Sequence, residues 1–184
     1  MNGVRLVIVV PCYNEEEVLK ETTRQLSDVL ARMEQEGKVA EGKILYVDDG
    51  SKDTTWKLIE QLSESHRCVA GLKLAHNVGH QQALWAGLDF VAAGDYDAAV
   101  SIDADLQDPP ELIIEMYETL QTTDYDCVAS RRVSRKGESK IRSFFARMFY
   151  KVIRKISKVN IMDGARDFRM MTRQMTDAVL SLRE

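Results

Sequence analysis

The feature that most constrains the fold of this chain is an alternation of short apolar runs with longer amphipathic stretches. Runs that are apolar on both faces and rich in β-branched residues are typical of strands in a parallel sheet covered by helices on both sides. Strands that alternate with helices form right-handed β-α-β units. The pattern therefore predicts an α/β fold with a mainly parallel, twisted sheet. The predicted strands are residues 6–10, 44–47, 69–74, 98–102 and 126–130.

Helices are expected wherever hydrophobic residues recur at helical spacing between these strands. Asn14 is expected to cap the first helix, with Glu15, Glu16 and Glu17 in its first turn, and Asp53 to cap the second. The predicted helices run from Asn14 to near residue 37, over 54–65, 79–93 and about 109–120, and over 174–184.

Length and composition fit one soluble domain over residues 1–184. The chain is 45% hydrophobic and 29% charged, with a net charge of -4. Its cysteines, Cys12, Cys68 and Cys127, lie in apolar stretches without metal-ligand spacing, so we expect reduced thiols in a cytosolic setting. No signal peptide is evident, and no segment approaches the roughly 18–20 apolar residues of a spanning helix. The final helix lacks a stop signal, which favours a chain truncated after Glu184.

Polar clusters follow the predicted strands that end at Val10, Val47, Leu74 and Ile102. In open α/β sheets, ligands bind at the carboxyl ends of the strands. The sequence therefore predicts one ligand site that collects these four clusters.

The strongest cluster is Asp103-Ala-Asp105-Leu-Gln107. In an extended segment, residues two apart point the same way, so both carboxylates and the amide oxygen would face one cleft. Hard oxygen ligands suit Mg²⁺ or Mn²⁺. Acidic loops are common in proteins without metal, but here a buried strand precedes the run and Pro109-Pro110 follows it. We expect a metal site on Asp105 and Gln107.

Three other clusters give weaker signals. Asp48-Asp49 at a strand end can accept hydrogen bonds from a base or ribose, although turn formation alone would explain part of this pattern. The turn that starts at Pro11 offers an aromatic ring that could lie against a base, but an ordinary strand-to-helix turn has the same ingredients. The segment from Asn77 to Ala83 could form an anion- or base-binding edge, and a lone His80 in it is assigned no role.

Residues 131–158 carry many basic side chains, a single acid (Glu138) and interleaved aromatic residues. Such a basic amphipathic segment is typical of a helix on an anionic membrane surface. A stripe that packs on the core, with a solvated basic face, is an equally good interpretation. Nucleic-acid binding is not expected, because an acidic cleft repels phosphate unless metal is present.

Taken together, the motifs resemble family 2 glycosyltransferases. Within that family the chain is similar to the polyprenyl-phosphate branch, which contains dolichol-phosphate mannose synthases and bacterial undecaprenyl-phosphate sugar transferases. The resemblance covers essentially the whole chain, and the run that starts at Asp103 is its most specific part. The matching motifs are Pro11-x-Tyr-Asn-Glu15, Val47-Asp-Asp-Gly-Ser51, Asn77-x-Gly79, Asp103-Ala-Asp-Leu-Gln-Asp-Pro-Pro-Glu111, Ala129-Ser-Arg131 and Asp167-Phe-Arg169.

The resemblance implies a GT-A (Rossmann-like) fold, a nucleotide-diphospho-sugar donor, Mg²⁺ or Mn²⁺, and a polyprenyl-phosphate acceptor at the cytoplasmic face of the cell membrane. It implies that Arg131 meets a phosphate and that Arg169 lies near the reacting centre, with Asp105 on the metal. For an acceptor hydroxyl, Asp167 is the first candidate base and Asp163 the second. By the same resemblance, the donor would contact Pro11, Tyr13, Glu15, Asp48, Asp49, Asn77, Gly79, Asp103 and Ala104.

Some alternatives stay open. His76 stands where the family usually has arginine, so a cation near the nucleotide would depend on pH. The acceptor could be a glycan hydroxyl, and the chain could be a non-catalytic nucleotide-binding module. A dinucleotide reductase is disfavoured, because the first turn lacks its glycines. The base is undecided, with UDP and a hexose such as glucose favoured, and so is the question of a homo-oligomer.

Overall fold

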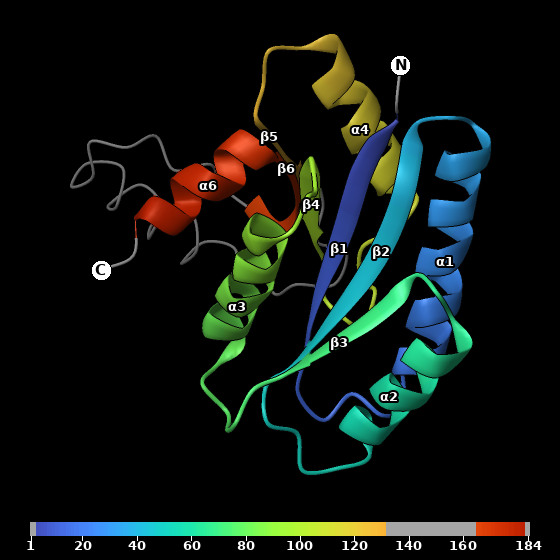
Figure 1. Cartoon of the computed structure of the whole chain (residues 1–184), viewed down its shortest axis with the longest axis vertical. Coiled ribbons are helices and arrows are strands. Elements are labelled where there is room, and N and C mark those ends of the chain that lie inside the picture. The colour runs from blue at the N-terminus through green and yellow to red at the C-terminus, as the bar shows by residue number, and fades with distance from the viewer. Residues whose placement is uncertain (1–2, 132–164, 183–184) are drawn as a thin grey trace, which may run out of the picture.

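The computed structural model describes residues 3–131 and 165–182, which form one sheet with helices on both faces (Figure 1). The strands are β1 (Val4–Cys12), β2 (Val39–Asp48), β3 (Val69–Lys73), β4 (Ala98–Ser101), β5 (Cys127–Arg131) and β6 (Ala165–Thr172). Their order across the sheet is β3-β2-β1-β4-β6-β5. Strands β1 to β4 are parallel, which confirms the predicted α/β class.

Strand β6 is the element that the sequence analysis missed. It pairs antiparallel with β4 and with β5, and so inserts between them. Its sequence mixes charged and apolar residues. The apolar side chains pack in the core, whereas the charged ones lie at the edge of the sheet where ligands are expected. Phe168, Met170 and Met171 are buried, whereas Asp167 and Arg169 stay half-exposed.

The helices are α1 (Leu19–Gln35), α2 (Thr55–Ser65), α3 (His80–Ala93), α4 (Leu112–Thr122) and α6 (Arg173–Ser181). Strand β1 shows how they cover the sheet, because its side chains alternate between two cores. Leu6, Ile8 and Val10 pack in the core under α1, α2 and α4. Val7 and Val9 pack in the core under α3 and α6 on the other face. This two-sided burial is the reason why the predicted strands read as continuous apolar runs.

The start of α1 differs from the prediction. The helix begins at Leu19 with Val18 as its N-cap, and no side chain caps it. Asn14 instead has a left-handed backbone (φ 56), and its side-chain oxygen accepts from the Lys52 amide, so it is not a cap. Its oxygen is used by the neighbouring turn, because the second strand-to-helix turn lies against the first. At α2 the N-cap is Thr54 and not Asp53, and no side chain caps the helix. Asp53, one residue earlier, accepts from the Thr55 amide at 3.0 Å.

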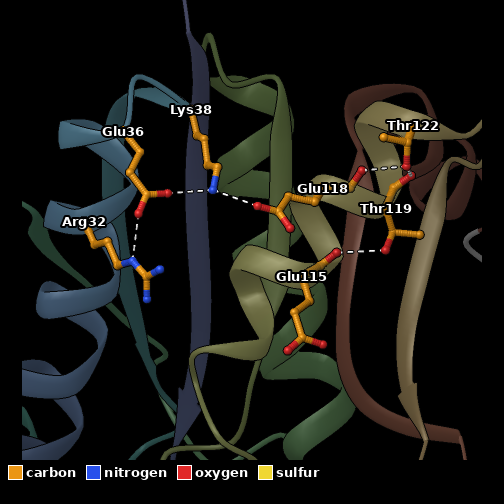
Figure 2. A network of polar contacts seen from close by, with 7 residues as sticks. All are labelled: Arg32, Glu36, Lys38, Glu115, Glu118, Thr119 and Thr122. Carbon is orange, nitrogen blue, oxygen red and sulfur yellow. Dashed lines mark hydrogen bonds and ion pairs between the residues drawn. The ribbon is translucent and has the colours of Figure 1, made fainter.

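A chain of ion pairs fastens α1 to α4 at the amino ends of the strands, away from the ligand edge (Figure 2). Lys38, just before β2, donates to Glu36 at 2.6 Å and to Glu118 of α4 at 2.8 Å. Arg32 donates to the other oxygen of Glu36 at 2.8 Å. The four charged side chains lie at the surface, and their link into one network is what makes these pairs more favourable than isolated surface pairs.

All three cysteines are free thiols in the described part of the chain. Cys12 is buried, and Cys68 and Cys127 are partly buried. Within that part, no helix is both long and apolar enough to cross a membrane. The basic segment predicted at residues 131–158 lies outside the described residues except for Arg131, and so does Asp163.

Candidate active site

A cleft of about 470 Å³ opens at the carboxyl ends of β1, β2 and β4. It collects the turns after these strands and the start of α3, and a part of β6 closes its far side. This is the edge at which the sequence predicted a ligand site. The lining residues are Pro11, Cys12, Tyr13, Glu15, Asp49, Asn77, Gly79, His80, Ala83, Asp103, Ala104, Asp105 and Asp167.

The first wall of the cleft is the turn after β1, which the turn after β2 holds in place. Three successive amides of the first turn donate to side chains of the second. They are Asn14 N to Ser51 Oγ at 3.0 Å, Glu15 N to Thr55 Oγ1 at 2.8 Å, and Glu16 N to Asp53 Oδ2 at 3.4 Å. The ring of Tyr13 stays 40% exposed, as a surface for stacking requires.

The two adjacent acids after β2 have different surroundings. Asp49 lines the cleft, and its carboxylate accepts from the amides of Val78 (2.7 Å) and Gly79 (2.9 Å). It thereby fixes the loop that leads into α3. Asp48 is fully buried outside the cleft lining, and its Oδ1 accepts from the Ser51 amide at 3.1 Å. The two carboxylates therefore do not form a pair that faces the ligand space.

The acidic loop after β4 is a turn and not the extended run that was predicted. The Leu106 amide donates to Asp103 O at 3.3 Å, and Leu106 has a left-handed backbone (φ 48). The alternation of side chains therefore breaks after Asp103. Asp103 and Asp105 line the cleft, whereas Gln107 lies outside the lining and donates its amide nitrogen to Asp105 Oδ2 at 2.7 Å.

Asp167 and Arg169 come from β6 and are brought to the cleft by its pairing with β4. Ser101 Oγ donates to the backbone oxygen of Asp167, which ties the two strands at this level. Arg169 donates to Asp167 Oδ1 at 2.8 Å, so the two form an ion pair. Of the two, only Asp167 belongs to the lining of the cleft.

The site concentrates negative charge. Partial burial raises the pKa of Glu15 above its ordinary value, and the carboxylates of Asp105, Asp53 and Asp103 raise it further. The pKa of the buried Cys12 thiol is also raised well above its ordinary value, first by desolvation and then by Glu15 and Asp48. This thiol is therefore held neutral and is no nucleophile.

The donor set fits a divalent cation that is completed by a ligand. The carboxylates of Asp103 and Asp105 are hard oxygen donors, and their mutual repulsion with Glu15 is what a cation would relieve. Among the described residues, no three His, Cys, Asp or Glu side chains form a cluster that could hold a metal. The two lining carboxylates suit an ion such as Mg²⁺ or Mn²⁺, which would be held by one or two of them together with phosphate oxygens.

Arg131 lies at the end of β5, in a separate depression between α4 and β5, so the structure does not bring it into the cleft with the other predicted residues. His80, Cys12 and Ala83 are lining residues to which the sequence analysis gave no role. For His80 a signal was available, because it is the first residue of α3, directly after Gly79 at a strand-to-helix connection.

Comparison with known proteins gives the site its context. The family model for Glycosyl transferase family 2 matches residues 7–180, nearly the whole chain. The chain belongs to glycosyl transferase family 2. The predicted family is thereby confirmed.

Curated relatives of this glycosyltransferase are similar over nearly all of its length. A glycosyltransferase of Synechocystis, itself uncharacterised, is 39% identical over 181 residues, which are 98% of this chain and 54% of that protein. The bactoprenol glucosyl transferase of Shigella phage SfV is 36% identical over 184 residues, which are 98% of this chain and 56% of that protein. This glycosyltransferase thus spans about half the length of the curated relatives it matches.

Solved structures confirm the GT-A fold. Glucosyl-3-phosphoglycerate synthase from Mycobacterium tuberculosis, solved with Mn²⁺ and UDP-glucose, has a TM-score of 0.61 at 21% identity, over 94% of this glycosyltransferase and 58% of that chain. A mannosyltransferase from Pyrobaculum calidifontis, solved with GDP-mannose and Mn²⁺, has a TM-score of 0.63 at 20% identity. The match covers 96% of this glycosyltransferase and 47% of that chain.

Proposed function

We propose that this glycosyltransferase moves a hexose from a UDP-sugar to a polyprenyl phosphate, with inversion at the anomeric carbon. The observation that carries the acceptor is the 36% identity, over nearly the whole chain, to a bactoprenol glucosyl transferase. The acidic cleft, with Tyr13 and Asp49 at one end and Asp167 at the other, supports a nucleotide-sugar donor. UDP is favoured over GDP because the named activity of this relative is glucosyl transfer.

In this proposal the acceptor phosphate attacks the anomeric carbon from the face opposite the departing nucleoside diphosphate. The Tyr13 ring and the Asp49 carboxylate hold the base and ribose, and the Asp105 carboxylate faces the diphosphate. Asp105, whose carboxylate accepts a hydrogen bond from Gln107, would hold Mg²⁺ or Mn²⁺, which would supply Lewis-acid stabilisation of the diphosphate leaving group. A lipid phosphate is already anionic near neutral pH and needs no general base.

Two arginines at the sheet edge, Arg169 and Arg131, would position the groups that react. Arg169 holds the Asp167 carboxylate at 2.8 Å and keeps it fixed beside the reacting centre. Arg131, in the adjoining depression beside α4, is proposed to receive the acceptor phosphate rather than the donor.

A glycan hydroxyl is the second candidate acceptor. It is favoured by the position of Asp167 in the lining of the cleft, where a carboxylate could take the proton of a hydroxyl nucleophile. Asp167→Asn separates the two acceptors. It should abolish transfer to a hydroxyl but reduce transfer to a lipid phosphate, which needs no base, by no more than about 10- to 100-fold, measured with radiolabelled UDP-glucose and each acceptor in turn.

The metal assignment is tested with Asp105→Ala. Transfer of glucose from UDP-glucose to undecaprenyl phosphate in the presence of Mn²⁺ should fall by about 100-fold or more, because the leaving group loses its stabilisation. The matched control is Asp28→Ala, which removes the same charge from the exposed face of α1, far from the cleft. Activity of Asp105→Ala equal to that of the control would remove the metal from this residue.

We further propose that residues 131–158 bring the enzyme to the anionic cytoplasmic face of the membrane, where its acceptor lies. The support is the basic and aromatic composition of this segment. Deletion of residues 142–158 should weaken co-sedimentation with vesicles that contain anionic lipid. Binding that stays unchanged after this deletion would contradict the proposal.

A further inference from the structure

The cleft carries an unbalanced negative charge. Its lining contains the carboxylates of Glu15, Asp49, Asp103, Asp105 and Asp167. No lysine or arginine of the described residues is part of that lining. The single basic side chain there is His80, the first residue of α3.

The pairing of β4 with β6 brings two of these acids close together. Ser101 lies opposite Arg169 in the antiparallel register. The pairing ends there. Asp103, two residues after Ser101, and Asp167, two residues before Arg169, both line the cleft next to this point. Two carboxylates this close repel each other, and a donor group between them would reduce the repulsion.

His80 supplies that group. Its Nε2 lies 3.6 Å from Asp103 Oδ1 and 3.8 Å from Asp167 Oδ2. The other oxygen of Asp167 is held by Arg169 at 2.8 Å. Both separations are longer than a hydrogen bond, and a single N–H at Nε2, which a neutral or a protonated imidazole can present, donates to one oxygen at a time. His80 therefore lies between the two carboxylates, within reach of either after a small shift.

The backbone that carries His80 is held in place. The preceding residue, Gly79, has a left-handed backbone (φ 97), and its amide donates to Asp49 at 2.9 Å. Asp49 is itself almost completely buried. The position of the imidazole is therefore linked to the nucleotide end of the cleft, whereas the two carboxylates that it approaches lie at the opposite end.

We propose that His80 is a positioning residue of the transfer reaction. Its Nε2 lies between the Asp103 and Asp167 carboxylates, and with the donor bound its N–H would donate to one of them and so orient both around the hexose. The inference rests on the proposed function, since it assigns the β4–β6 side of the cleft to the transferred sugar. It concerns the sugar and not the nucleotide, because Tyr13 and Asp49 lie on the β1–β2 side.

The test compares three substitutions in the full chain. In His80→Gln, the amide nitrogen reaches the place of Nε2 and can donate to both carboxylates. In His80→Asn, the amide nitrogen stops at the place of Nδ1, and His80→Ala has no donor. Isothermal titration with UDP-glucose and with UDP, each with Mn²⁺, and transfer to undecaprenyl phosphate are measured for all three. His66→Gln, at the end of α2 and outside the cleft, is the control.

We expect kcat/KM for transfer to fall about 10- to 100-fold in His80→Ala and His80→Asn, as displaced catalytic groups require, and to recover largely in His80→Gln. Affinity for UDP-glucose should follow the same order, while affinity for UDP stays within about twofold of wild type. The melting temperatures of the variants show whether each is folded. If His80→Ala does not fold, the comparison of His80→Gln with His80→Asn still tests the proposal.

Two results would overturn the role of His80. One is activity and UDP-glucose affinity that stay at the wild-type level in both the alanine and the asparagine variant. The other is an equal loss of affinity for UDP and UDP-glucose, which would place His80 with the nucleotide. A wild-type chain that binds UDP-glucose but transfers nothing to undecaprenyl phosphate would instead contradict the proposed function, and the titrations would still decide the role of His80.

Discussion

At the scale of single residues, the negative charge of the cleft affects the pKa of Glu15. Its pKa is raised first by partial burial and then by Asp105, Asp53 and Asp103. For a carboxyl group whose pKa is higher in the folded than in the unfolded state, folding is favoured by protonation. The contribution of Glu15 to the free energy of unfolding is therefore fully present below its unfolded-state pKa and is lost as the pH rises through the folded-state pKa.

Glu15→Gln is consequently expected to make the ligand-free protein more stable than wild type at neutral pH. The difference should shrink as the pH falls below the folded-state pKa, because wild-type Glu15 then becomes neutral too. Urea unfolding between about pH 4 and pH 8 measures it. Glu17→Gln, at an exposed neighbouring position, is the control. A variant that is less stable than wild type at neutral pH would show that a hydrogen bond of Glu15 outweighs the repulsion.

At the scale of elements, the first two strand-to-helix turns act as one unit. Thr55, at the start of α2, is fully buried, and its hydroxyl accepts from the Glu15 amide. Thr55→Val keeps the shape but leaves that amide without its acceptor, at a cost of about 1–3 kcal/mol. The same change should weaken UDP binding, because the turn carries Tyr13. Thr55→Ser keeps the hydroxyl and should retain both properties in urea unfolding and titration.

Helix α3 lies close against the sheet, and Gly87 makes that approach feasible. A methyl group at this position would overlap Val9 Cγ1 and lie 3.2 Å from Val47 Cγ2. Alanine would improve the intrinsic helix propensity by about 1 kcal/mol. Overpacking against β-branched side chains on two central strands costs about 1–3 kcal/mol, so it outweighs this gain.

Gly87→Ala should therefore lower the free energy of unfolding, although an exposed helical Gly→Ala substitution stabilises most proteins. A raised midpoint in urea would mean that α3 can shift outward at little cost. Because α3 also carries His80 at its first turn, such a shift would be visible as reduced binding of UDP-glucose.

At the scale of the whole molecule, the cleft joins elements from nearly the entire described chain, and metal and nucleotide should depend on each other. Because one or two carboxylates bind Mg²⁺ or Mn²⁺ weakly without phosphate oxygens, Mn²⁺ alone should stabilise the protein little. Mn²⁺ with UDP at a hundredfold excess over Kd should add about 2.7 kcal/mol, which raises Tm by about 5–10 °C. Chelation with EDTA should reverse the shift. Equal shifts with and without Mn²⁺ would contradict a metal shared with the diphosphate.

The sequence by itself determined the fold class and the edge of the sheet that binds ligands. Strands buried on both faces must be apolar throughout, and the turns that follow them must be polar. The local composition of the sequence therefore predicts both the fold class and the ligand edge. Tyr13, Asp49 and Asp103 could be assigned to the cleft for this reason. The conformation of the loop after Asp103 could not, because one left-handed residue, Leu106, ends the alternation on which the prediction for Gln107 rested.

Only the tertiary structure decided what stands at the far side of the cleft. The insertion of β6 between β4 and β5 is a pairing between segments more than 60 residues apart, which no local pattern encodes. That pairing sets Asp167 against Asp103 and brings both to His80 on another helix. Local sequence fixes which residues are polar and where the chain turns. Strand order, settled by the burial of the whole sheet, decides which of those polar residues meet.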